Sequence, residues 1–352
     1  MRGRKPKKTK ERPHKAAPTV ARTLIRTQWK SLRPMFDFWG VEMKRHYSLE
    51  TLSNAVDRLV RTSDRFIVRS VQMVLGPPPV TSLTFELFQE GKYQIVFRLR
   101  ATNAKGNQAS FGFIVAKNAT DFTEVSRLEH GNMNRIHGRS PKYVVEPLLG
   151  GMIFLPDRHR RETHHREVYA YLTRWLGGFH ELGIAKNLQY YLNVAPPQYL
   201  TLAQTQDAKR ACVEIIASTY SMKDRNGTAM PQIASGDFVI ARPSNGPLKL
   251  RLIACRKLLD KVPPARYLHE IIKTKWAWGD KTARLAPDDP REFAAAIRAA
   301  RGNEEGTAWL AEYVSAVESK KMPDAGYMSR KDAGLPGVAR KAPARAIARR
   351  SE

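Results

Sequence analysis

Asp237 has the setting in this chain that most suggests chemistry. It lies in the motif SGDF, at the first turn of residues 232–258, where two strand-like runs flank the turn Pro-Ser-Asn-Gly-Pro. An aspartate at such a turn can act as a general base if an acceptor hydroxyl comes within hydrogen-bond reach. Gly and Asp are also ordinary residues of tight turns. The sequence therefore leaves a catalytic and a purely conformational role open for Asp237.

A histidine-rich segment offers a second set of chemically active side chains. Residues 156–166 contain three histidines and one glutamate: His159, His164, His165 and Glu162. Histidine and carboxylate groups are common metal ligands. Adjacent histidines seldom face one ion, and the arginines of this segment repel cations, so we expect a solvated basic loop and no metal site. The two cysteines of the chain have no zinc spacing and form no disulfide framework.

The elements that must position Asp237 follow from the hydrophobic pattern. Residues 34–65 end in an amphipathic helix that Ser48 and Thr51 can start, and residues 66–117 predict an antiparallel meander of three or four strands, beginning with FIVRSVQMVL. The later elements are expected in this order: a helix over 121–137, strands in KYVVEPLLGGMIFL and EVYAYLTRWL, a long helix at about 203–220, the hairpin, and helices over 263–319, one of which starts at Asp289 and Pro290.

This order is similar to that of the protein-kinase-like fold, and within it to the aminoglycoside and choline kinases, over about residues 66–319. The motif FIVAK resembles the family's third-strand motif, whose lysine holds the nucleotide phosphates, and this resemblance puts Lys117 in that role. In the family, the next helix supplies a carboxylate that orients the lysine. Glu129 fits this position because apolar residues follow it at the fourth and seventh places, and Glu124 is the second choice.

The resemblance also concerns the base and the reaction. YLTRWL resembles the strand that leads into the adenine-binding hinge, which implies that Arg174 and Trp175 lie near the nucleotide. SGDF resembles the family's His-Gly-Asp motif, which puts Asp237 in the position of the catalytic base. The resemblance thus implies ATP as the nucleotide.

The chain departs from the family where a metal should bind. Arg242 replaces a metal-binding Asn five residues after Asp237, and Ala254 or Cys255 replaces the second metal-binding Asp. The Gly-rich phosphate cover is replaced by LGPPPVTS. Mg²⁺ is a main source of charge stabilisation in phosphoryl transfer, so we expect a degenerate phosphotransferase and leave the use of Mg²⁺ open. Three arginines could supply positive charge directly: Arg242, Arg251 and Arg256.

Most of the net charge of +27 lies near the two ends. Residues 1–33 hold 12 Lys and Arg against Glu11, and residues 320–352 hold nine against three acids, so these segments contribute +17. We expect both to be disordered basic tails that bind DNA, RNA or another polyanion by counterion release. The opening MRGRKPK resembles an AT-hook. The expected polyanion-binding residues are Arg2, Arg4, Lys5, Lys7, Lys8 and Lys10.

These patterns together predict an α+β, two-lobed kinase-like fold with disordered basic tails. The expected parts are a basic arm over 1–33, an N-terminal helix and antiparallel-sheet lobe over 34–176, a mainly helical lobe over 177–319 with the hairpin 232–258, and a tail over 320–352.

The expected function is that of a degenerate phosphotransferase-like protein that acts through nucleotide or partner binding. An active phosphotransferase with an unusual metal site and a polyanion-binding scaffold are the alternatives. No apolar run approaches the ~20 residues of a membrane span. The low cysteine usage favours a cytoplasmic location.

Overall fold

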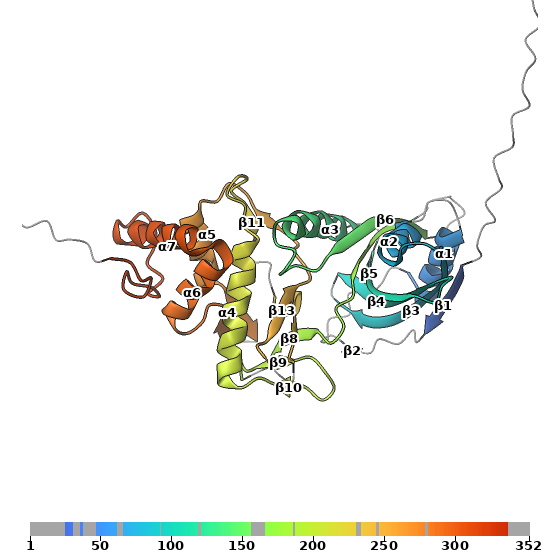
Figure 1. The fold of residues 1–352 in the computed structure, drawn as a ribbon, viewed down its shortest axis with the longest axis horizontal. Coiled ribbons are helices and arrows are strands. Elements are labelled where there is room, and N and C mark those ends of the chain that lie inside the picture. The colour runs from blue at the N-terminus through green and yellow to red at the C-terminus, as the bar shows by residue number, and fades with distance from the viewer. Residues whose placement is uncertain are drawn as a thin grey trace, which may run out of the picture.

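The computed structural model describes residues 25–30, 36–37, 47–61, 66–91, 93–118, 121–155, 166–185, 187–229, 234–243, 246–278 and 281–336. These residues form an α+β fold, as predicted. The larger sheet lies at one end of the molecule, and most of the C-terminal helices lie at the other (Figure 1).

Seven strands form the larger sheet. They are β1 (Arg26–Lys30), β2 (Phe36–Asp37), β3 (Val80–Glu90), β4 (Gln94–Asn103), β5 (Gln108–Ala116), β6 (Pro147–Leu155) and β7 (Arg166–Arg174). The strand order is β1-β3-β4-β5-β7-β6, with β2 also beside β3. β1 and β2 pair with β3 in parallel, and the other pairs are antiparallel. The predicted meander is thus confirmed for β3, β4 and β5.

Two helices cover one face of this sheet. They are α1 (Leu49–Arg61) and α2 (Phe66–Leu75). Ser48 Oγ accepts a hydrogen bond from the Thr51 N–H at 3.0 Å, which satisfies a free donor at the start of α1 as predicted. The helices and the inner face of the sheet share one buried apolar cluster, to which Val71, Phe97 and Phe113 belong.

The described residues after β7 form most of a second apolar cluster around a smaller sheet. Its strand order is β10-β9-β8-β12-β13, with β8 (His180–Ile184), β9 (Tyr190–Leu192), β10 (Gln198–Tyr199), β12 (Phe238–Ala241) and β13 (Lys249–Leu252). The helices are α4 (Leu202–Ser218), α5 (Pro264–Lys273), α6 (Pro290–Arg301) and α7 (Asn303–Glu318). This part also contains two short antiparallel strand pairs. One is β11 (Gly227–Thr228) with β14 (Leu258–Leu259), and the other is β15 (Lys275–Trp278) with β16 (Lys281–Arg284).

Helix α3 (Asp121–Arg139) connects the two parts. It lies in the chain between β5 and β6 of the larger sheet, yet its Met133 and Ile136 are buried in the second cluster. Figure 1 shows α3 between the two ends of the molecule. A polar residue on the sheet-facing side of α3 is therefore well placed to contact both parts.

The strand predicted over residues 66–75 is wrong, because these residues form helix α2. The buried residues Phe66, Ile67, Ser70 and Val71 repeat at helical spacing. A short run of β-branched residues does not by itself distinguish a strand from a buried helix. Packing of these residues against the sheet decides the outcome.

The helices predicted over 263–319 are confirmed except at 275–284, where β15 and β16 form a hairpin. The start of α6 is also as predicted. Asp289 Oδ1 accepts a hydrogen bond from the Arg291 N–H at 2.8 Å, and Pro290 occupies the first turn.

Parts of both expected tails belong to the fold, so the prediction of disorder is wrong for them. β1 pairs with β3, and the Trp29 ring stacks on Phe85 with a centroid distance of 4.3 Å. Tyr327, Met328 and Ala333 are buried in the second cluster. The remaining tail residues, including the six expected polyanion-binding side chains, lie outside the described residues.

Candidate functional site

Glu129 places a carboxylate inside the protein, on the side of α3 that faces the sheet. Its side chain is only 1% exposed. Glu129 Oε1 accepts hydrogen bonds from Tyr171 Oη at 2.6 Å and from Gln94 Nε2 at 3.0 Å. Burial raises the pKa of Glu129, and this effect outweighs the opposing influence of Arg256 and of the two hydrogen bonds.

Asp237 lies in a 3-10 turn, Ser235–Asp237, directly before β12. Its carboxylate is buried and fully engaged. Arg256 donates through Nη1 to Oδ2 at 2.8 Å and through Nη2 to Oδ1 at 2.7 Å. The Ala234 N–H also donates to Oδ2 at 2.8 Å, which closes the turn. The two oxygens of Asp237 are therefore already occupied, and the contact with Ala234 is the kind expected of the conformational alternative.

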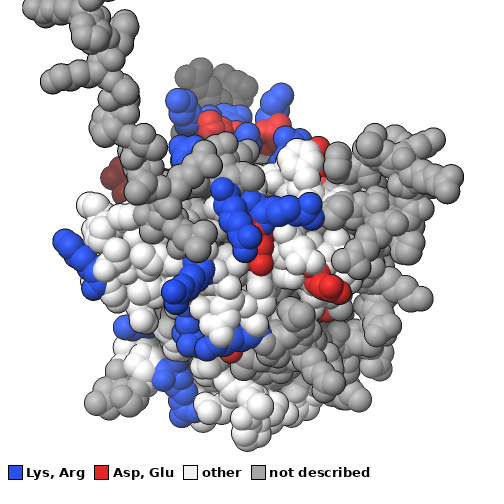
Figure 2. Space-filling model, turned by 90° about the vertical axis from the view of Figure 1, so that its right-hand side faces the viewer, with Lys and Arg blue, Asp and Glu red and all other residues white. Residues whose placement is uncertain are grey.

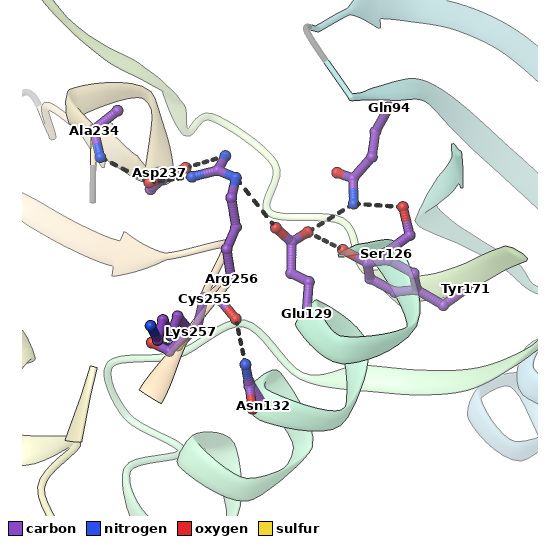
Figure 3. A network of polar contacts seen from close by, with 10 residues as sticks. All are labelled: Gln94, Ser126, Glu129, Asn132, Tyr171, Ala234, Asp237, Cys255, Arg256 and Lys257. Atoms are coloured by element: carbon purple, nitrogen blue, oxygen red, sulfur yellow. Dashed lines mark hydrogen bonds and ion pairs between the residues drawn. The ribbon is translucent and has the colours of Figure 1, made fainter. Parts of the chain in front are cut away.

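Arg256 joins Asp237 to Glu129, and we call these three residues the Arg256 bridge (Figure 3). Its Nε lies 3.7 Å from Glu129 Oε2. That carboxylate oxygen is buried and has no hydrogen-bond partner. Burial opposes the charge of Arg256, but the attraction of Asp237 and Glu129 is larger, so the pKa of Arg256 is raised. The guanidinium thus remains charged between two carboxyl groups.

A neighbouring contact fixes the bridge to α3. Asn132, one turn after Glu129, donates from Nδ2 to the backbone oxygen of Cys255 at 3.1 Å. Figure 3 shows Glu129 and Asn132 projecting from α3 toward the segment that carries Cys255 and Arg256. The Arg256 bridge therefore ties the sheet-associated helix to the segment after β13.

Glu181 on β8 is a further, half-buried carboxyl group near the bridge. Its Oε2 accepts hydrogen bonds from Gln89 at 3.2 Å and Asn193 at 3.1 Å. Burial raises the pKa of Glu181, and the nearby Asp237 adds to this effect. A Cβ atom at Gly236 would lie 2.1 Å from Glu181 Oε1. A larger residue at position 236 would therefore have to displace the Glu181 carboxyl group.

Lys117 does not pair with Glu129, which corrects the predicted site. Lys117 is buried, and its Nζ lies 3.1 Å from Glu90 Oε1. Gln94, which bonds to Glu129, lies opposite Ala116 in the sheet. Successive side chains of a strand point to opposite faces. This alternation puts Ala116 on the face of Glu129 and Lys117 on the other face.

The other predicted site residues also have their own partners. Arg174 Nε lies 2.8 Å from Glu146 Oε2. Trp175 packs edge-on against Phe88, and the Arg98 guanidinium lies 5.4 Å from the Trp175 ring centre. Glu124, the second choice for the carboxylate, is exposed and paired with Arg127. These four contacts lie outside the Arg256 bridge. Among the predicted site residues that the structure describes, it thus brings only Glu129 and Asp237 together.

The residues present do not fit the Mg²⁺ that the resemblance implies. Mg²⁺ requires oxygen ligands in near-octahedral geometry. Arg242 is exposed, and Ala254 and Cys255 offer no side-chain oxygen. Both oxygens of Asp237 bind Arg256. Within the described ranges, no group of three His, Cys, Asp or Glu residues is suited to hold a metal ion. The three histidines of 156–166 fall outside those ranges.

The comparisons with known proteins add no family. No protein-family model matches the chain, and no curated protein matches it either. Among the residues that the structure describes, no helix is both long and apolar enough to cross a membrane.

Sequence reasoning underrated Arg256 and missed Gln94 and Tyr171. Arg256 was one of three arginines with no distinguishing position. Its place directly after Cys255 was a usable signal. At that point the kinase-like family has a metal-binding Asp, and this chain has no acid. Gln94 and Tyr171 gave no such signal, because strand pairing alone brings them to Glu129.

Proposed function

We propose that this protein is a two-lobed, kinase-like, phosphotransferase-like protein that has lost metal-dependent transfer and acts by binding a nucleotide or a partner. The Arg256 bridge carries the proposal. It occupies both oxygens of the residue in the catalytic-base position with a permanent cation. A base engaged in this way is not available to accept a proton from an acceptor hydroxyl.

The order of the elements supports the kinase-like part of the proposal. β3, β4 and β5 form a meander, α3 follows the third of these strands, and β7 pairs with β5 before the long helix α4 and the hairpin β12–β13. The resemblance implies the same order of third strand, carboxylate-bearing helix, hinge strand, long helix and Gly-Asp hairpin. Glu129 and Asp237, one from each half of this order, meet at Arg256.

The test is ATP binding and ATP consumption by the full chain. Calorimetry with ATP is expected to show binding, and a phosphate-release assay with Mg²⁺ is expected to show no turnover above a blank. Asp237→Asn is the matched control, because it preserves the shape of the side chain. Mg²⁺-dependent ATP consumption that disappears in Asp237→Asn would overturn the loss of transfer. Absence of ATP binding would overturn the nucleotide as ligand.

A second candidate function is the binding of a polyanion at the α1 end of the molecule. Four exposed basic residues lie on β1 and α1: Arg26, Lys30, Arg58 and Arg61. The hydrogen bond from Trp29 Nε1 to Asp57 at 3.1 Å holds the two elements together. Figure 2 looks onto this end and shows more Lys and Arg than Asp and Glu. The basic residues 1–24 are continuous in sequence with β1.

Fluorescence anisotropy with a short labelled DNA or RNA tests this second function. Binding is expected to weaken steeply as salt rises, because phosphate contacts release counterions. Removing residues 1–24 is expected to lower the affinity at least tenfold, and Arg58→Ala with Arg61→Ala to lower it less. Binding that neither change affects would contradict the assignment.

A further inference from the structure

The site differs most clearly from that of a metal-dependent phosphotransferase in the source of its positive charge, which is the Arg256 guanidinium. In the related enzymes, metal ions neutralise the acidic residues and the phosphates. Here a guanidinium contacts both oxygens of Asp237, at 2.8 and 2.7 Å, and lies 3.7 Å from Glu129. The side chain of Asp237 is 4% exposed and that of Glu129 is 1% exposed. Two buried carboxyl groups thus share one cation that belongs to the chain.

We propose that Arg256 is the resident cation of this site and that it excludes divalent metal ions from Asp237 and Glu129. The expectation that a metal ion would otherwise bind at Asp237 and Glu129 rests on the proposed function. The exclusion itself rests only on the Arg256 bridge, so the two can be tested separately.

Two observations on Glu129 support a cation site that Arg256 fills. Its Oε2 is buried, points to the guanidinium and has no hydrogen-bond partner, so it is an oxygen with a free lone pair inside the protein. Its other oxygen is held by Tyr171 and Gln94, which fixes the direction of the carboxyl group. An oxygen held in this way beside Asp237 is the kind of ligand that a hard divalent cation prefers.

The chemistry of arginine explains the expected exclusion of metal ions. Its planar fork binds a carboxylate through two parallel hydrogen bonds, as it does at Asp237, and its charge is permanent. The Arg256 side chain is 26% exposed, whereas the two carboxyl groups are buried. A metal ion that approaches the site therefore meets a positive charge before either acid.

The test uses Mn²⁺ alone, without any nucleotide. Free Mn²⁺ is followed by electron paramagnetic resonance during titration of the full chain. The wild type is expected to bind no Mn²⁺ at this site at millimolar concentration. Arg256→Gln is expected to bind one equivalent at least tenfold more tightly than the wild type. The double variant Arg256→Gln with Asp237→Asn is the matched control and is expected to return to the wild-type level.

Either of two results would overturn the proposal. One is an Arg256→Gln protein that folds and binds Mn²⁺ no better than the wild type. The other is a wild type that binds one equivalent and loses it in Asp237→Asn. If Arg256→Gln does not fold, Arg256→Met also removes the charge while it keeps an unbranched side chain in the site. The affinity of this variant for Mn²⁺ is then expected to rise at least tenfold, and an unchanged affinity would refute the exclusion. ATP binding plays no part in these results, so they are independent of the outcome for the proposed function.

Discussion

One face of the larger sheet is packed with apolar side chains from α1 and α2, whereas the other face meets α3 through buried polar groups. Strand β5 shows the contrast within a few residues. Phe113 and Val115 belong to the apolar cluster. Ile114 and Ala116 lie opposite Tyr171 and Gln94, which hold Glu129.

On each face a positively charged side chain pairs with a carboxylate: Lys117, which is buried, and Arg256, which is partly exposed. The two pairs differ in what they connect. Lys117, directly after β5, and Glu90, at the end of β3, belong to a single sheet in which β4 separates their strands. Arg256 joins Asp237 to Glu129 on α3 and so links the two parts of the molecule. The comparison teaches that strand alternation decides the face on which a strand-end lysine lies. It also shows that the charged partner of a buried acid can come from a segment distant in the sequence.

The largest expected effect concerns the apolar face. Phe97 is fully buried and contacts the rings of Trp29 and Phe113. Phe97→Ala is expected to lower the free energy of unfolding by about 3–5 kcal/mol, because it removes buried surface and leaves a cavity. Arg100→Ala, on the exposed face of the same strand, is the control and should change it by less than about 1 kcal/mol. Urea denaturation of both variants measures the difference. Equal losses would mean that the two faces do not differ as described.

The second effect concerns the Arg256 bridge. Asp237→Asn removes the charged group closest to the Arg256 guanidinium and is expected to cost about 2–3 kcal/mol. The control is Asp207→Asn, which weakens the exposed pair of Asp207 with Arg210 and should cost at most about 1 kcal/mol. The measurement is the midpoint of urea unfolding at constant slope. A similar loss of unfolding free energy in the two variants would show that the Arg256 bridge contributes no more than an exposed ion pair.

The third prediction separates Lys117 from the site. Lys117→Met keeps the length of the buried side chain and leaves Glu90, which is partly exposed, without its ion pair. We expect a loss of stability of about 1–2 kcal/mol and no change in ATP affinity. Calorimetry on the variant measures both the binding and, by scanning, the stability. ATP binding that is lost while the fold is kept would return Lys117 to the site.

The smallest effect concerns the pKa of Glu181. Burial raises this pKa, so the folded state takes up a proton more readily than the unfolded state. The stabilisation from this group is complete below the unfolded value of about 4.3 and is lost as pH rises through the folded value. Glu181→Gln remains neutral, and its oxygen can still accept from Gln89 and Asn193. The variant is expected to be more stable than the wild type by about 0.5–1 kcal/mol at pH 8, with a smaller difference near pH 4.5.

Urea midpoints for Glu181→Gln and the wild type across this pH range measure the difference. A variant that is less stable at pH 8 would mean that Glu181 is held in its charged form.

The fold class and most elements could be predicted because their signals are local. Alternating apolar residues identified β3, β4 and β5, and Asp289 with Pro290 identified the start of α6. The helix α2 could not be predicted in this way, because its β-branched residues suit a strand as well as a helix buried against a sheet. β1 was not predicted, because it lies in a basic segment and becomes a strand only by pairing in parallel with β3.

The candidate site could be predicted only in part. The Gly-Asp turn marked Asp237, and helical spacing marked Glu129. The arginine that joins them could not be predicted from sequence spacing. Arg256 lies 127 positions from Glu129 in the sequence and contacts it only through tertiary packing. The side on which Lys117 lies depended on the register of β4 and β5, and a shift by one residue reverses it.

The central claim is that Arg256 is the cation shared by Asp237 and Glu129, and a double-mutant cycle tests it most directly. Stabilities of the wild type, Arg256→Gln, Asp237→Asn and the double variant give the coupling energy of the pair. The account predicts a coupling of about 1.5–3 kcal/mol that changes little between low and high salt, because the pair is largely buried. A coupling below about 0.5 kcal/mol, or one that salt abolishes, would contradict it.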